Sequence, residues 1–395
     1  MLKNDLYYKS QLQKVLVRGG LLRFIFLFIV VVIFNDSISP YIMSDDIAYE
    51  KLANTYLSKS SSVFDLHLIS LIGVDNYLEV FWPYVMCISA KLFQTEYAGR
   101  IINCLLSTYC IFLVYNLTLL VSGIKETALK AAKLFAYLPY PWIICCFPLK
   151  DIFLTTVVLV VFTIFVKIQN GIKIPVGHLV ITLFLLIATS FTRGAVVEFL
   201  GLVGSLFVVK SLIDRKKTHY AILVGLLGIT VLFNIWNDIM ESFQTKIEDY
   251  NTEEYKSIGL MRHIQINSLT DLWKLPATYF FAMIQPMTLS IFKTDWSNWS
   301  YFLRILNISM YPIAFGNLIY AFTKKYNKLF WYTSFLMYAS VFSLSLGIYR
   351  HYLFLFPFLV INYACNQSIN TKKYSNKIIT AGTFFMILVV VFLSL

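Results

Sequence analysis

Long apolar runs separated by short polar segments fill almost the whole chain. A helix that crosses a bilayer needs about 20 mostly apolar residues. The pattern therefore predicts about eleven membrane spans, which makes the fold class all-α and the protein a polytopic integral membrane protein. One more apolar segment, 277–292, contains Gln285 and Pro286, and we interpret it as a re-entrant or interfacial helix. The expected spans lie near residues 19–36, 100–121, 131–148, 152–168, 178–193, 195–213, 219–237, 301–322, 328–348, 350–366 and 378–395.

Composition supports this interpretation. The chain is 58% hydrophobic and 14% charged, whereas a soluble domain averages about 25% charged residues. We therefore expect residues 1–395 to form a single transmembrane domain with no sizeable soluble part. The net charge of +12 does not indicate nucleic-acid binding here, because surplus Lys and Arg in polytopic proteins normally lie in cytoplasmic loops beside anionic lipid.

The basic loops predict the orientation in the membrane. With eleven spans, every second loop is basic, and these loops are expected to face the cytoplasm together with the N-terminus. Two long loops, 35–99 and 238–300, are then extracytoplasmic. The apolar run 21–34 lacks a clear cleavage site after it, so we interpret it as a retained helix. The basic groups are Lys3 to Arg18, Lys125 to Lys133, Lys167 with Lys173, Arg215 to Lys217, Lys324 to Lys328, and Lys372 to Lys377.

Two amphipathic helices are predicted in the first extracytoplasmic loop. One covers 45–57, with Ser44 as its cap, and the other covers 77–93. Helices of this kind lie along a membrane surface.

Charged residues gather at the predicted outer ends of the spans, where the positive-inside rule expects few basic groups. Guanidinium and ammonium groups suit phosphate oxygens, so this rim indicates a site for an anion such as a lipid phosphate. Simpler roles stay open: first-turn acids favoured by the helix dipole, interfacial anchors, and a local Lys150–Asp151 ion pair. The rim residues are Asp45, Asp46, Arg100, Lys150, Asp151, Arg193, Arg262, Arg350 and His351.

The six cysteines lie mostly inside apolar runs and show no metal-ligand spacing, so we interpret them as small packing residues. No cofactor is required by any motif. A divalent metal is possible but is not indicated, because no His/Asp cluster has ligand spacing.

The order of these motifs resembles the glycosyltransferase C (GT-C) superfamily, of the protein mannosyltransferase and aminoarabinose transferase type. The likeness covers roughly residues 20–200. It consists of an acidic motif opening a juxtamembrane helix (SDDIAYE, 44–50), a second such helix from Phe81, a span beginning with Arg100 and Asn103, and the pair Lys150–Asp151.

The resemblance implies an inverting glycosyltransferase that uses a polyprenyl-phosphate-linked sugar, with a glycan or lipid-linked acceptor and membrane lipids as partners. It implies Asp45 as the general base, Asp46 orienting or replacing it, and Asp151 as a second acidic group of the acceptor site. Arg100, Lys150 and Arg350 would bind the donor phosphate, with Arg193, Arg262 and His351 behind them. Composition rich in Lys, Asn, Ile, Phe and Tyr suggests an AT-rich bacterial gene, as surface-polysaccharide loci often are. The resemblance then implies a protein of the bacterial inner membrane that acts in surface-polysaccharide synthesis.

Two alternatives stay open. An O-antigen or capsule polymerase or ligase would use Arg and His residues of the later large loop, such as Arg262 and His263. A lipid or sugar transporter would place its ionisable groups near the bilayer midplane and often has repeated halves, neither of which this sequence displays.

Overall fold

The computed structural model describes residues 2–33, 44–65, 80–230, 273–274, 311–320, 326–344, 354–369, 377 and 379–384. Within these ranges the chain is helical apart from turns and short connections, and it contains no strand. The predicted all-α class is therefore confirmed. The loop 238–300 lies outside the described residues except for 273–274.

Five helical segments in the described part are long and apolar enough to cross a membrane, which supports the interpretation as a membrane protein. They coincide with the first, second, fourth, fifth and sixth predicted spans, although the first helix begins well before residue 19. The segments are Asp5–Ile33, Ala98–Ser122, Asp151–Gln169, Val176–Gly194 and Val196–Asp214.

The predicted third span, 131–148, is not one helix. The structure has α7 (Lys125–Tyr137) and the short α8 (Pro139–Ile144), separated at Leu138, whose backbone is extended with ψ 138°. Pro139 explains the break, because a residue before proline is pushed out of the helical region and proline itself donates no backbone hydrogen bond.

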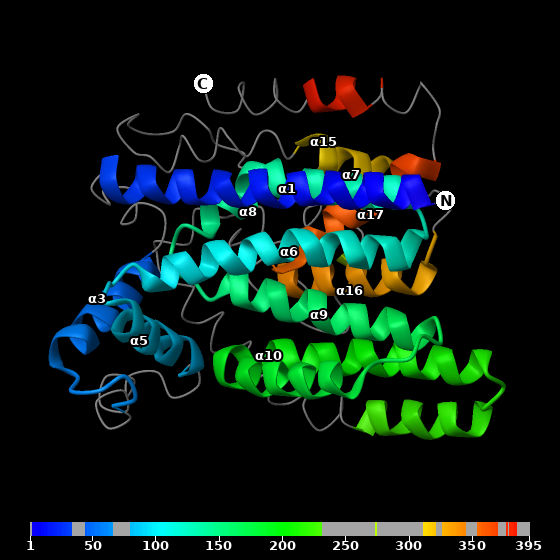
Figure 1. Cartoon of the computed structure of the whole chain (residues 1–395). Coiled ribbons are helices and arrows are strands. Elements are labelled where there is room, and N and C mark those ends of the chain that lie inside the picture. The colour runs from blue at the N-terminus through cyan, green and yellow to red at the C-terminus, as the bar shows by residue number, and fades with distance from the viewer. Residues whose placement is uncertain are drawn as a thin grey trace.

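The long helices run side by side, with α9 (Asp151–Gln169) at their centre (Figure 1). It packs against α6 (Ala98–Ser122) and against α10 (Val176–Asp214). The most apolar stretch of α9 is 72% buried, against 22% for the first half of α10, so α9 is a core helix and that half of α10 faces outward. At Arg193 the extended backbone (φ −163°, ψ 88°) divides α10 into its two predicted spans.

α1 (Leu2–Phe28) continues into a π-helical turn, η1 (Ile29–Ile33), and packs on α6 and α7. An aromatic cluster around Phe162 joins α9 to the later helices: its ring centroid is 4.5 Å from Phe358 of α17 (Phe356–Ile369) and 6.0 Å from Phe330 of α16 (Lys328–Leu344). α15 (Tyr311–Ile319) packs on α17. Such rings bury large apolar areas, so the two halves of the chain share one core.

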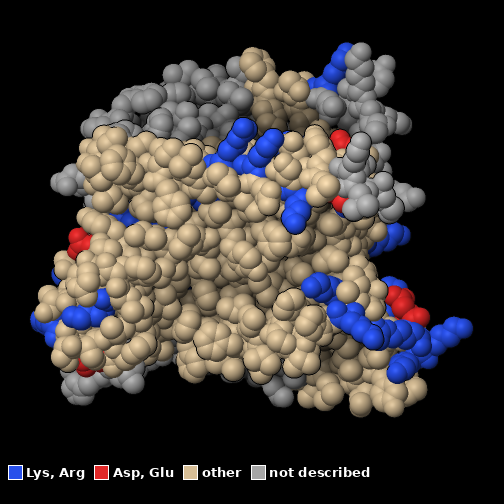
Figure 2. All heavy atoms as spheres, in the orientation of Figure 1, with Lys and Arg blue, Asp and Glu red and all other residues tan. Residues whose placement is uncertain are grey.

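The helices α3 (Ser44–Lys59) and α5 (Phe81–Phe93) pack together at the end of the bundle opposite the N-terminus (Figure 1). We call this the α3–α5 end. α3 matches the predicted helix 45–57, and α5 begins four residues later than predicted at Phe81. Figure 2 shows basic side chains at both ends of the visible face and along α1, with a mainly uncharged band elsewhere.

The contact between α9 and α10 gives a test of the packing. A Cβ at Gly204 would lie 2.6 Å from Cζ of Phe165, whereas a Cβ at Gly201 would meet nothing within 4 Å. We expect Gly204→Leu to destabilise the protein by about 1–3 kcal/mol through overpacking, and Gly201→Leu to have little effect. Thermal unfolding of the detergent-purified protein measures both, and equal effects of the two variants would contradict this packing.

A second test concerns the α3–α5 pair. Burial raises the pKa of the Cys87 thiol from its ordinary 9.0 to about 12, and burial also raises that of Tyr56, which packs against it. The folded state favours the protonated thiol. Its contribution to the free energy of unfolding is therefore fully present below pH 9 and is lost as the pH rises through about 12. We expect Cys87 in the folded protein to resist maleimide near neutral pH, and a cysteine at exposed Asn54 to react quickly. Peptide mapping by mass spectrometry measures both rates. Rapid labelling of native Cys87 would contradict the pairing.

Candidate functional site

A buried ion pair joins α3 to the first turn of α6. The side chain of Arg100 is fully buried, and its Nε donates to Oε1 of Glu50, whose side chain is 15% exposed. The guanidinium carbon also lies 5.5 Å from the ring centroid of Tyr97 and 5.9 Å from that of Phe147. A charge removed from water needs such partners, so Arg100 is fixed by α3 on one side and by aromatic faces on the other.

The face of α3 that carries Glu50 is the buried face of this helix. Ala53 is 1% exposed and Tyr56 is fully buried, and both follow Glu50 at a spacing of three residues. The Tyr56 hydroxyl donates to the Val63 carbonyl at 2.9 Å and accepts from the Asp65 amide at 2.8 Å. The helix therefore has one defined orientation on the bundle, with Glu50 turned toward α6.

Side-chain hydrogen bonds hold the loop between α8 and α9 in place. The Asn103 amide of α6 donates to the carbonyls of Phe147 and Leu149, both at 2.8 Å. The Trp82 indole of α5 donates to the carbonyl of Pro148 at 2.7 Å. Three consecutive carbonyls thus find donors on two helices, because buried backbone groups need partners. This loop fixes where α9 begins.

Lys150 and Asp151 stand at that beginning. Lys150 precedes the first turn of α9 and is 8% exposed, and Asp151 opens the helix and is 3% exposed. A carboxylate in a first turn is favoured by the helix dipole, and burial of both charges makes their electrostatic effects stronger than at a surface. The hydrogen bonds from Asn103 and the stacking of Phe147 on Arg100 connect this pair to the start of α6.

The structure brings three predicted site residues onto connected elements at the α3–α5 end: Arg100, Lys150 and Asp151. Asp45 and Asp46 belong to the first turn of α3, but their side chains lie outside the described part of the chain. Arg193 lies at the break in α10, partly exposed. The remaining predicted residues, Arg262, Arg350 and His351, lie outside the described residues.

Glu50 was not among the predicted site residues, although it belongs to the acidic motif of α3. Helical periodicity offers the signal: positions 50, 53 and 56 hold Glu, Ala and Tyr on one face, and a buried Arg at the start of the next span requires an acid nearby. Asn103 and Trp82 are further contributors, and their role is to position the loop before α9.

Among the residues the structure describes, the side chains that could bind a metal ion together are three thiols, those of Cys104, Cys145 and Cys146. They lie on the chain next to Asn103 and Phe147, directly beside the loop just described.

We compared the chain with models of protein families, with curated proteins and with solved structures, and none of the three comparisons finds a match. The GT-C resemblance therefore remains a prediction that rests on the motifs themselves.

The buried ion pair predicts a large energetic coupling. Removing one partner of a buried pair typically costs about 3–5 kcal/mol, whereas an exposed pair contributes about 0–1 kcal/mol. We expect Glu50→Gln and Arg100→Gln each to lower the unfolding temperature strongly, and the double variant to lose less than the sum of the two.

The exposed pair Lys210–Asp214 on α10 is the matched control, because both of its side chains are 48% exposed. Asp214→Asn is expected to change the unfolding temperature little. Additive effects of Glu50→Gln and Arg100→Gln would contradict the pairing of α3 with α6.

Proposed function

We propose that this protein is a membrane glycosyltransferase of the GT-C type. It would move a sugar from a polyprenyl-phosphate-linked donor to a glycan or lipid-linked acceptor at the extracytoplasmic membrane face, inverting the anomeric centre. In this proposal the chain has about eleven spans, α3 and α5 are interfacial helices, and the N-terminus is cytoplasmic in a bacterial inner membrane.

One observation carries the proposal: the Glu50–Arg100 pair fastens the helix that begins with Asp45 and Asp46 to the end of the bundle where Lys150 and Asp151 lie. Carboxylates and cations that are separated by about a hundred residues of sequence thus belong to one end of the molecule. A transfer from a phosphate leaving group needs both kinds of group near the same bond.

The carboxylates and the cations have different roles in the transfer. The hydroxyl oxygen of the acceptor bonds to the anomeric carbon while a carboxylate accepts the hydroxyl proton, and the bond from that carbon to the phosphate oxygen breaks. The negative charge that grows on the departing phosphate is stabilised by fixed cations. Asp45 or Asp46 is the proposed base, Asp151 lies toward the acceptor, and the cations are Arg100 and Lys150, with Arg193, Arg262, Arg350 and His351 as further donor contacts.

The described contacts bear on one of these assignments. A donor phosphate would compete with the Glu50 carboxylate for Arg100, so Arg100 is first of all a positioning residue for α3.

The test is transfer in vitro. Purified protein in lipid nanodiscs is incubated with polyprenyl-phosphate sugars and candidate acceptors, and products are followed by mass spectrometry. We expect Asp45→Asn or Asp46→Asn to lower the rate by about 10²–10⁴-fold, as loss of a general base does. Asp5→Asn, at the opposite end of the bundle, is the matched control and should retain the rate.

Loss of activity in Arg262→Ala with full activity in both Asp variants would contradict the proposal and favour the polymerase or ligase class. Movement of intact lipid-linked sugar across liposomes without its consumption would instead favour a transporter.

A further inference from the structure

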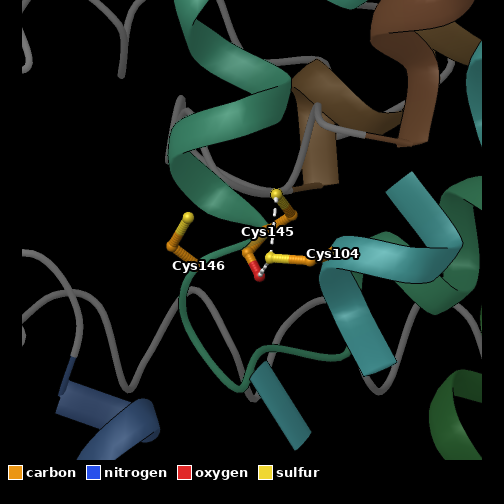
Figure 3. Close-up of side chains that lie close together, drawn as sticks. All are labelled: Cys104, Cys145 and Cys146. Atoms are coloured by element: carbon orange, nitrogen blue, oxygen red, sulfur yellow. Dashed lines mark hydrogen bonds between the residues drawn. The ribbon is translucent and has the colours of Figure 1, made fainter. Parts of the chain in front are cut away.

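Three cysteines from distant parts of the sequence meet inside the bundle (Figure 3). Cys104 comes from α6, and Cys145 and Cys146 follow α8. All three side chains are buried, and their Sγ atoms lie within 4.8 Å of one another. The sulfurs of Cys104 and Cys145, joined by a dashed line in Figure 3, are 3.9 Å apart. The sequence spacing conceals this cluster because 41 residues separate its two parts.

The geometry suits a metal ion. A Zn²⁺–S bond is about 2.3 Å long, which places two sulfur ligands in tetrahedral geometry about 3.8 Å apart. The Cys104–Cys145 separation already has this value to within about 0.1 Å. The third sulfur needs a movement of an ångström or less, and thiolates select soft ions such as Zn²⁺ and Cu⁺.

A buried arginine lies beside the thiols. Arg23 of α1 is fully buried; its Nε donates to Ser107 at 2.7 Å, and its Nη1 donates to the Gly19 and Ala136 carbonyls at 2.8 and 3.2 Å. Its Nη2 has no hydrogen-bond partner among the described residues. The Cys146 thiol lies 3.5 Å from the Arg23 carbonyl.

Within the described part of the chain, no carboxylate forms an ion pair with Arg23. The ionisable groups around it include the thiols of Cys145, Cys110, Cys104 and Cys146. An ionised side chain inside a membrane protein is costly without a counter-charge and marks a functional site by default. While the thiols are neutral, the positive charge of the Arg23 guanidinium therefore has no counter-charge in the cluster.

We propose that Cys104, Cys145 and Cys146 bind a thiophilic metal ion, Zn²⁺ by charge balance, with a water molecule as its fourth ligand, and that this site fastens the loop before α9 to α6. Binding of Zn²⁺ releases three thiol protons to solvent, and no electron is transferred. The resulting zinc–thiolate group carries one negative charge, which Arg23 balances. Cu⁺ with the same three thiolates would carry two negative charges and leave one unbalanced.

This inference is independent of the proposed transfer activity, because its readout is metal content. The full chain is purified in detergent with reductant and chelator, loaded with Zn²⁺ or, without oxygen, with Cu⁺, desalted and analysed by mass spectrometry for metal. Wild type should retain one Zn²⁺ per chain, and Co²⁺ in its place should give a thiolate charge-transfer band in the near ultraviolet.

Cys104→Ser, Cys145→Ser and Cys146→Ser should each weaken Zn²⁺ binding by more than the roughly 10–100-fold that an outer-shell partner contributes. The matched controls are Cys110→Ser, on the same helix with its thiol 3.3 Å from Thr156, and Cys365→Ser. Both should retain the ion. Arg23→Gln should weaken binding while Arg23→Lys restores it, which distinguishes charge balance from packing.

A chelator should lower the unfolding temperature of wild type but not of Cys104→Ser, a readout that stays informative if a variant is merely less stable. Absence of stoichiometric metal in wild type, or equal loading of wild type and Cys104→Ser, would overturn the site. Retention of Cu⁺ without Zn²⁺ would overturn the assignment of the ion.

Discussion

The Glu50–Arg100 ion pair is the interaction on which the candidate site depends. α3 is short and largely polar on its exposed side, so its position comes from one buried face, formed by Glu50, Ala53 and Tyr56. Pairing a buried guanidinium with a carboxylate is costly unless the geometry is well satisfied. α3 packs on α5, and the ion pair links it to α6 in one orientation, which determines where the first turn of α3 lies.

A second set of contacts holds the loop before α9. The loop 145–150 carries Lys150 toward the same end, and its carbonyls are held by Asn103 and Trp82. The loop itself contributes Cys145 and Cys146 to the thiol cluster, and the Cys146 thiol contacts the Arg23 carbonyl. Two sets of contacts thus position this charged end, the Glu50–Arg100 ion pair and the hydrogen bonds to the loop before α9, on a framework of apolar helices.

Hydrophobic runs predicted the all-α class, helix α3 and five of the spans, because apolar length and amphipathic period are local properties. Pro139 is the sequence signal for the break at Leu138, but the continuous apolar run 131–148 led to the prediction of a single span. Rim position made Arg100, Lys150 and Asp151 candidates, and the structure places these three on connected elements. Glu50 and the thiol cluster were missed because their partners are distant in sequence: 50 residues separate Glu50 from Arg100, and no local pattern encodes such a contact.

The proposed site requires the α3–α5 end to be extracytoplasmic, and labelling in intact cells tests this most directly. Lys51→Cys on α3 and Lys216→Cys after α10 are both exposed positions at opposite ends of the bundle. A membrane-impermeant maleimide should modify the cysteine at 51 in intact cells and the cysteine at 216 only after permeabilisation. Labelling of 216 from outside, with 51 protected until permeabilisation, would contradict the account.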